Sequence, residues 1–228
     1  MHFKPVTHVI FDMDGLIIES ESIYKKILQQ IAKEYGKKYT EEIEGKVLGT
    51  TEKDTAKIFL HDLDIPLSVD EFLDIYHKKV KEQLQNPSLM PGAERLIVHL
   101  SKHNVPIAVA TSSSQEALLV KTKNHQNIFK LFHHIVCGST DPEVKNGKPA
   151  PDIFLVCASR FPEKVDPEKC LVLEDAPNGI KGAISAGMQG VLVPAKNVGE
   201  GQRKLATLVI ESLEEFRPEF FGLPPFEN

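Results

Sequence analysis

The sequence has few cysteines, no surplus of basic residues and no long apolar run, and each shortage excludes a class of protein. Three cysteines provide no disulfide framework, and their odd number favours reduced thiols in the cytoplasm. The 27 Lys and Arg against 32 Asp and Glu give a formal net charge of −5, which offers no basic surface to nucleic acid or to an anionic membrane. No apolar run approaches the roughly 18 residues that cross a bilayer, and the N-terminal segment lacks the order of a signal peptide. We therefore expect a soluble, cytoplasmic, globular protein; its oligomeric state stays open, with a monomer as the default.

Short runs of Val, Ile and Leu alternate with helical patterns along most of the chain. Runs that are apolar on both faces are typical of strands in a parallel sheet, with the intervening helices as right-handed crossovers. The order predicts an α/β fold with a doubly wound parallel sheet. Two of the helices have clear limits, one from Pro91 to Asn104 and one from Pro177 to Gly187. The predicted strands are Val6–Phe11, Val105–Ala110, His134–Cys137, Cys170–Leu173 and Val191–Val193.

The segment between the first two strands shows helical periodicity only, and it is far longer than the roughly 2–6 residues of an ordinary βα loop. We therefore predict two domains: an α/β core formed by residues 1–16 and 89–228, and a small α-helical cap domain formed by residues 17–88 over the C-terminal end of the sheet. Ser20 and Thr51 are expected to cap helices of this insertion. The apolar tail 218–228 is expected to pack against the core. The expected cap helices are Ser20–Tyr35, Thr40–Lys46, Glu52–Leu63 and Val69–Leu84.

Two carboxylates, Asp12 and Asp14, lie at the end of the first predicted strand. On a strand, residues i and i+2 point to the same side, so these acids would repel each other unless a cation lies nearby. A divalent metal ion is the natural candidate for that cation. The alternative is an Asp-rich turn in which Gly15 adopts a positive φ.

Further polar residues follow the other strands. Thr111 and Ser112 come at the end of the second strand, where hydroxyls and backbone amides before a helix can hold a phosphate, although such residues also serve as plain N-caps. Lys148 follows the third strand and could supply one positive charge, or lie exposed in its loop. Glu174 and Asp175 follow the fourth strand. In an open α/β sheet, ligands bind at the carboxyl ends of the strands, so together these residues predict a site for a Mg²⁺-bound phosphate.

The order of four motifs, DMDG, ATSS, GKPAPD and EDAPNG, resembles that of the haloacid dehalogenase superfamily of phosphohydrolases. The resemblance covers essentially the whole chain, including the helical cap between the first two motifs. It implies a Mg²⁺-dependent phosphatase that acts on a small phosphorylated metabolite, such as a phosphosugar or a nucleotide-like 5′-phosphate. From the net negative charge we expect no nucleic acid and no membrane partner.

The resemblance also implies a role for each motif residue. Asp12 would be the nucleophile that forms an aspartyl-phosphate, and Asp14 the general acid and base. Thr111, Lys148 and the backbone amide of Ser112 would bind the phosphoryl oxygens. The metal ligands would be a carboxylate oxygen of Asp12, the backbone carbonyl of Asp14, and Asp175. Glu174 would either bind the metal directly or hydrogen-bond to groups that surround the ligands, and we favour the second role.

The cap provides the remaining candidates, Gly49 and Glu19, as residues that contact the substrate. Gly49 would allow close approach of the backbone, or would be an ordinary loop glycine. Glu19 stands where the family often has Asp, which leaves the substrate less defined. Glu52 occupies a position where related β-phosphoglucomutases have a cation for a second phosphate, so its negative charge favours hydrolysis, although Lys53 keeps the mutase alternative open. A non-catalytic phosphometabolite-binding protein is the further alternative, and the intact motif residues argue against it.

Overall fold

The structure, a computed structural model, describes residues 3–47, 50–84, 86–195 and 198–227. Its centre is a six-stranded, all-parallel sheet in the order β3-β2-β1-β4-β5-β6. Every predicted strand is present, with limits shifted by up to a few residues. A sixth strand at the sheet edge, only two residues long, was not predicted. The strands are β1 (His8–Phe11), β2 (Ile107–Thr111), β3 (His134–Cys137), β4 (Cys170–Glu174), β5 (Gln189–Leu192) and β6 (Leu208–Val209).

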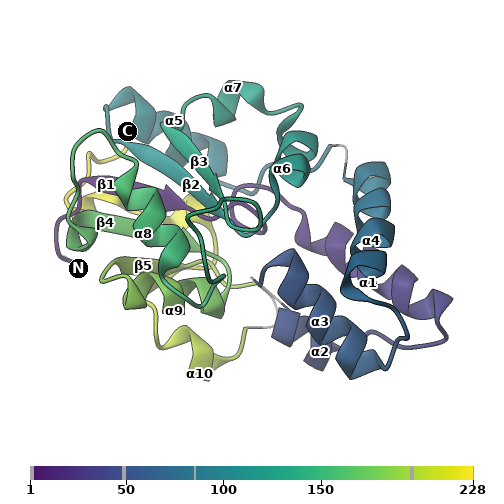
Figure 1. The fold of residues 1–228 in the computed structure, drawn as a ribbon. Helices are drawn as coiled ribbons and strands as arrows, with labels where there is room; N and C mark the ends of the chain where they lie inside the picture. The colour runs from purple at the N-terminus through teal and green to yellow at the C-terminus, as the bar shows by residue number, and fades with distance from the viewer. Residues whose placement is uncertain (1–2, 48–49, 85, 196–197, 228) are drawn as a thin grey trace.

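Helices cover both faces of the sheet, as expected for a doubly wound α/β fold (Figure 1). The side chains of β2 and β4 are buried along their whole length, which explains their continuous apolar runs. One face packs against α5 and α7, and the other against α8 and α9. The helices of the core are α5 (Ala93–Lys102), α6 (Gln115–Thr122), α7 (Gln126–Phe129), α8 (Asp152–Ser159), α9 (Pro177–Ser185) and α10 (Glu200–Arg203), with short 3-10 turns at Pro167–Lys169, Leu213–Glu215 and Pro218–Phe221.

The apolar tail packs against the core, as predicted. Phe221 is fully buried, and its ring stacks on that of Phe3 with centroids 4.7 Å apart. The guanidinium of Arg95 lies 4.2 Å from the ring centroid of Phe226. The positive φ values of Asn104 and Gly187 end α5 and α9 where the sequence predicted those ends. Within the described part of the chain, none of the helices is both long enough and apolar enough to span a bilayer.

The regular elements of the insertion after β1 are all helices in its described residues, as predicted, apart from isolated β-bridges at Ile18, and the insertion lies at the ends of the strands (Figure 1). Its four helices enclose a hydrophobic cluster of their own, centred on Phe59, Phe72 and Tyr76. The cluster runs from Ile27 to Leu84, whereas Ile17 and Ile18 are buried in the cluster of the core, so the bounds 17–88 stay a prediction. The helices are α1 (Glu21–Glu34), α2 (Glu41–Val47), α3 (Glu52–Leu63) and α4 (Val69–Gln83).

One predicted helix cap is right and another is wrong. The Thr51 hydroxyl accepts a hydrogen bond from the backbone N–H of Asp54 and caps α3. Ser20 precedes α1, but it makes no capping bond; its hydroxyl donates to the carboxylate of Asp14 instead. A hydrogen bond to a charged acceptor is about twice as strong as a neutral one, which accounts for the difference.

Candidate active site

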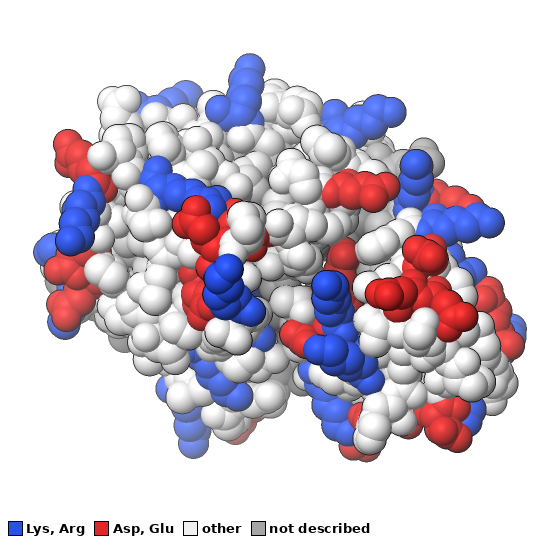
Figure 2. Space-filling view, in the orientation of Figure 1, with Lys and Arg blue, Asp and Glu red and all other residues white. Residues whose placement is uncertain are grey.

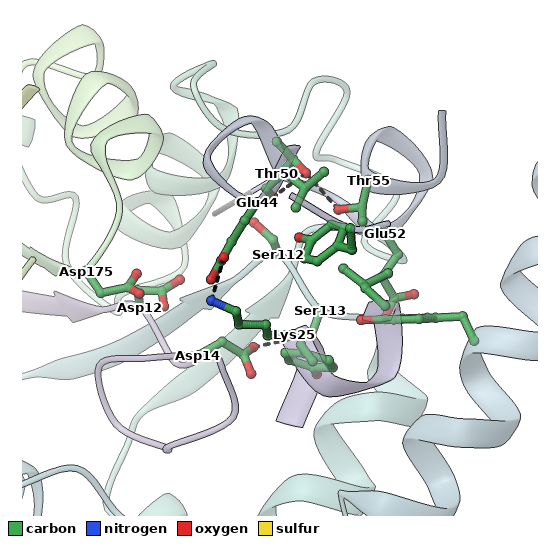
Figure 3. Close-up of a pocket in the computed structure, with 15 residues that line it drawn as sticks. Asp12, Asp14, Lys25, Glu44, Thr50, Glu52, Thr55, Ser112, Ser113 and Asp175 are labelled. Atoms are coloured by element: carbon green, nitrogen blue, oxygen red, sulfur yellow. Dashed lines mark hydrogen bonds and ion pairs between the residues drawn. The ribbon is translucent and has the colours of Figure 1, made fainter. Parts of the chain in front are cut away.

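The candidate site lies at the carboxyl ends of β1 and β4, where the strand order of the sheet reverses. In doubly wound sheets this switch point forms the crevice in which ligands bind. Asp12 follows β1 directly, Glu174 is the last residue of β4, and Asp175 comes next. The carboxylates of Asp12 and Asp175 lie beside each other in Figure 3. The sheet therefore brings together acids that are more than 160 residues apart in sequence.

Lys148 joins two of these acids from the loop after β3. Its Nζ donates to Asp12 Oδ1 at 2.6 Å, to Glu174 Oε1 at 2.6 Å and to the backbone carbonyl of Ala110 at 3.0 Å. Lys148 is 4% exposed, so the alternative of an exposed loop lysine is wrong. All three ammonium protons have acceptors, which fixes the charge beside Asp12.

The electrostatic balance of this cluster favours a further cation. Burial, together with the neighbouring charges of Glu174 and Asp14, raises the pKa of Asp12 to about 7 even though Lys148 opposes the shift. For Lys148, burial disfavours the charged form but is outweighed by Asp12 and Glu174, so its pKa is raised. The two carboxylates thus keep Lys148 charged, but its single positive charge does not offset the two negative charges of Asp12 and Glu174.

Three buried carboxylates have the composition of a hard-cation site. Asp12, Glu174 and Asp175 each offer an oxygen, and these oxygens lie within 4.8 Å of one another. Carboxylate oxygens are the ligands that Mg²⁺ prefers, so the donor set fits that ion. Both oxygens of Glu174 already have protein partners, Lys148 and the backbone N–H of Ala176 at 3.2 Å.

Gly179 packs directly against the Glu174 carboxylate, and this contact yields a first prediction. A Cβ at Gly179 would lie 1.9 Å from Glu174 Cδ, and Glu174 is held by Lys148 and is only 1% exposed. We expect Gly179→Ala to lower the free energy of unfolding by about 1–3 kcal/mol, because the carboxylate cannot move without losing its partners. Chemical denaturation measures the change. Gly201→Ala is the matched control, since a Cβ there meets nothing within 4 Å; equal stability of the two variants would show that Glu174 is free to shift.

Asp14 binds a different set of partners from Asp12. Its carboxylate accepts hydrogen bonds from Lys121 Nζ at 2.6 and 2.7 Å, from Ser113 Oγ at 2.9 Å and from the Ser20 hydroxyl. Burial alone would raise the pKa of Asp14, but the charge and hydrogen bonds of Lys121 outweigh it, with help from the two serines, so the pKa is lowered. β1 ends before both acids, so strand alternation does not direct their side chains.

The hydroxyl residues of the second motif also lie at the site. Thr111 is fully buried; its hydroxyl is 3.4 Å from Asp14 Oδ2 and accepts from the backbone N–H of Ser113 at 3.1 Å. Ser112 lines the same cavity as the aspartates, and its carbonyl accepts from Ser139 Oγ at 2.7 Å. The structure therefore brings Ser112 to the cavity together with Asp12 and Asp14, whereas Thr111 lies behind the cavity wall, beside Asp14 and Ser113.

The cap residues proposed from the sequence have different outcomes. Gly49 lies outside the described residues. Glu19 is half-buried and accepts hydrogen bonds from the backbone N–H of Ser22 at 3.4 Å and from its hydroxyl at 3.0 Å, so its side chain binds the first turn of α1 although Ser20 occupies the N-cap position. Glu19 also lines a neighbouring cavity that reaches Asp175.

A cavity separates the aspartates from the cap (Figure 3). Its cap side carries aromatic rings, hydroxyls and two acids. Lys25 of α1 enters the cavity and pairs with Glu44 of α2 at 2.7 Å. Thr50 and Thr55 hydrogen-bond to each other at 2.8 Å. The cap side chains that line this cavity are Tyr24, Lys25, Leu28, Tyr39, Glu44, Val47, Thr50, Glu52, Thr55 and Tyr76.

Sequence reasoning missed Lys121 and Ser113, which hold Asp14. Lys121 is fully buried on the inner face of α6, together with Ala117, Leu118 and Thr122. The available signal was spacing: a lysine three and four residues after two apolar residues shares their helix face. The neighbouring apolar residue Leu119 is 61% exposed, so hydrophobicity alone does not identify which face of α6 is buried.

Comparisons with known proteins agree with this geometry. The family model described as haloacid dehalogenase-like hydrolase matches residues 9–193. A probable pseudouridine-5′-phosphatase of Drosophila melanogaster is 45% identical, covering 99% of this chain and 97% of the relative. (DL)-Glycerol-3-phosphatase 2 of Arabidopsis thaliana is 42% identical, covering 98% and 94%. The crystal structure of β-phosphoglucomutase from Clostridium difficile has a TM-score of 0.76 at 25% identity, covering 94% and 95%. The chain therefore belongs to the haloacid dehalogenase-like hydrolases, and is a phosphoric monoester hydrolase of that family.

Proposed function

We propose that the chain is a Mg²⁺-dependent phosphomonoesterase that works through an aspartyl-phosphate on Asp12. The observation that carries the proposal is the buried cluster of Asp12, Lys148, Glu174 and Asp175 at the switch point of the sheet. A carboxylate attacks a phosphate dianion poorly unless nearby positive charge offsets the repulsion. The cluster has one buried ammonium and a carboxylate set suited to a second cation.

The proposed metal ligands are a carboxylate oxygen of Asp12, Asp175 and the backbone carbonyl of Asp14. Glu174 acts behind them, because its two oxygens bind Lys148 and the Ala176 amide. When bound, Mg²⁺ supplies positive charge that lowers the repulsion between a phosphate ester and the acids. Removal of the metal with a chelator is expected to abolish turnover.

The proposed reaction has two steps. In the first, a carboxylate oxygen of Asp12 bonds to phosphorus, the bond to the leaving oxygen breaks, and Asp14 gives its proton to that oxygen. In the second, water attacks phosphorus, Asp14 takes the water proton, and the bond between phosphorus and Asp12 breaks to release phosphate. Lys148, the Thr111 hydroxyl and the Ser112 backbone amide bind the phosphoryl oxygens. For donation in the first step, Asp14 must hold a proton that the adjacent Lys121 disfavours in the resting state.

We propose a small phosphosugar or nucleotide-like 5′-phosphate as the substrate class, with pseudouridine 5′-phosphate as the first candidate. The relative from Drosophila melanogaster supports this candidate by its name. The cavity supports the class, because the tyrosines and threonines on its cap side suit an aromatic ring and sugar hydroxyls. Residues 17–88 act in this proposal as a cap domain that covers the leaving group.

Hydrolysis is favoured over phosphosugar mutation by the charge of the cap. Glu44 and Glu52 both line the cavity, whereas Lys25 is its one cationic cap side chain among the described residues, and it is already paired with Glu44. Lys53, the candidate for gripping a second phosphate, is exposed on α3. A bisphosphate would therefore meet more negative than positive charge.

The compartment and oligomeric state complete the proposal. We place the protein in the cytoplasm as a monomer. All three cysteines are buried and none forms a disulfide, which suits a reducing compartment. Figure 2 shows acidic and basic side chains interspersed over one face, without an extended surface of one sign.

A substrate panel with and without Mg²⁺ tests the proposed function. We expect a higher kcat/KM for pseudouridine 5′-phosphate than for uridine 5′-phosphate, glycerol 3-phosphate, glucose 1,6-bisphosphate or p-nitrophenyl phosphate. No compound should be turned over in EDTA. Hydrolysis of p-nitrophenyl phosphate reports phosphatase activity even if the natural leaving group is not in the panel. Release of phosphate from no compound would favour a binding protein. Conversion of glucose 1-phosphate to glucose 6-phosphate would favour a mutase.

A further inference from the structure

Lys121 is a buried charge that the proposed chemistry does not use. It lies in the last turn of α6, and its side chain is fully buried. Side chains on a helix tilt toward its N-terminus, so Lys121 reaches back along α6 toward the loop that follows β2. That direction brings its ammonium to Asp14, 107 residues away in sequence.

The contacts of this ammonium form a closed group. Lys121 Nζ donates to both oxygens of Asp14, at 2.6 and 2.7 Å, and to Ser113 Oγ at 2.6 Å. Ser113 Oγ in turn donates to Asp14 Oδ2 at 2.9 Å. The ring of Tyr24, on cap helix α1, lies 4.7 Å from the same Nζ. Lys121 therefore binds both Asp14 oxygens and the serine that fixes one of them.

Stability alone does not account for a lysine at this position. A buried ion pair gains about as much from attraction as it loses from desolvation, and apolar residues of similar volume are often at least as stable. A methionine of similar length would fill the space below the Tyr24 ring without burying a charge. What the ammonium provides beyond the two serine hydroxyls is a charged donor to both oxygens of the Asp14 carboxylate at once, which fixes its orientation.

We propose that Lys121 is a positioning residue, which holds the Asp14 carboxylate at the cavity wall in the orientation from which it exchanges a proton with the leaving oxygen and with water. The inference rests on the proposed function, in which Asp14 is the acid and base. Ser20 donates to Asp14 from the start of the cap, and Tyr24 covers Lys121 from α1. Core and cap thus both contribute to the orientation of one carboxylate.

Replacement of Lys121 by methionine tests this role through a difference between substrates. An alkyl phosphate needs the proton of Asp14 to leave, whereas p-nitrophenolate leaves without it. We expect Lys121→Met to lower single-turnover cleavage of an alkyl phosphate by roughly 10–100-fold, the loss typical of a misplaced catalytic group. The rapid first release of p-nitrophenolate should change less than about threefold, well below the roughly 10²-fold contribution of proton transfer. Lys123→Met, on the exposed side of the same helix end, is the matched control and should behave as wild type.

A double variant separates positioning from structure. In an Asp14→Asn background, Lys121→Met should cause no further loss with the alkyl phosphate, because the group that it orients is gone. Equal losses on both substrates, additive losses in the double variant, or no loss at all would each overturn the proposal.

If Lys121→Met does not fold, Ser113→Ala, which removes the hydroxyl shared by Lys121 and Asp14, should give the same difference between substrates. If wild type or Asp14→Asn fails to show the expected chemistry, the proposed function fails. If both show it but Lys121→Met gives no difference between the two substrates, only this inference fails.

Discussion

Asp12→Asn is expected to lower turnover of any phosphate ester by roughly 10³-fold or more while the protein stays folded. The amide cannot form the acyl-phosphate bond, yet its carbonyl oxygen can still accept the hydrogen bond that Lys148 gives to Asp12. Steady-state assays measure the loss. Asp70→Asn, at an exposed position in the first turn of α4, is the control and should keep full activity.

The stability of Asp12→Asn provides an independent check. The folded-state pKa of Asp12 is raised from 3.8, the value expected in an unfolded chain, to about 7. The free energy of unfolding therefore falls as the pH rises from the lower value to the higher one, and it stays at the lower level above pH 7. The asparagine does not ionise and escapes that cost. We therefore expect the variant, in EDTA at pH 8, to be at least as stable as wild type. A variant within about tenfold of wild-type turnover would exclude Asp12 as the nucleophile.

Asp14→Asn is expected to slow the chemistry by roughly 10²–10⁴-fold without removing Mg²⁺ binding. The proposed metal contact of Asp14 is its backbone carbonyl, which the substitution preserves. The loss should be greatest for alkyl phosphates, whose leaving oxygen needs a proton. With p-nitrophenyl phosphate, rapid mixing should show a fast first release of p-nitrophenolate, followed by slow dephosphorylation of Asp12, because water activation also needs Asp14.

Two measurements accompany the Asp14 variant. Calorimetry should give a Mg²⁺ affinity close to that of wild type, and thermal melting should show some destabilisation, because Lys121 loses its charged partner. If metal affinity collapses and both substrates lose activity equally, the Asp14 side chain is a metal ligand. In that case its assignment as acid and base is wrong.

Most of the fold could be predicted because its signals are local. The continuous apolar runs of β2 and β4 predict buried parallel strands, and Asn104 and Gly187 predict the ends of two helices. β6 was missed because a half-buried strand of two residues has no period to detect.

The site could be predicted in part, since the carboxyl ends of parallel strands meet at one edge. That rule brought Asp12, Ser112 and Asp175 to one cavity. Burial of Lys148 could not be predicted, because it depends on packing between segments 136 residues apart. Ser20 was assigned to the helix end by a local rule, but a charged acceptor nearby in space binds its hydroxyl. Prediction of the contact between Lys121 and Asp14 would have required both the identity of the buried face of α6 and the distance between the two residues, and neither follows from the local sequence.

Chemical trapping of the intermediate tests the central claim most directly. Enzyme turning over a phosphate ester with Mg²⁺ would be quenched in acid and reduced with borohydride, which converts an aspartyl-phosphate into homoserine. Peptide mass spectrometry then reads the site. The account predicts homoserine at position 12, in an amount that rises in Asp14→Asn and is absent in EDTA. Homoserine at another position, or none at Asp12 while the enzyme hydrolyses substrate, would contradict it.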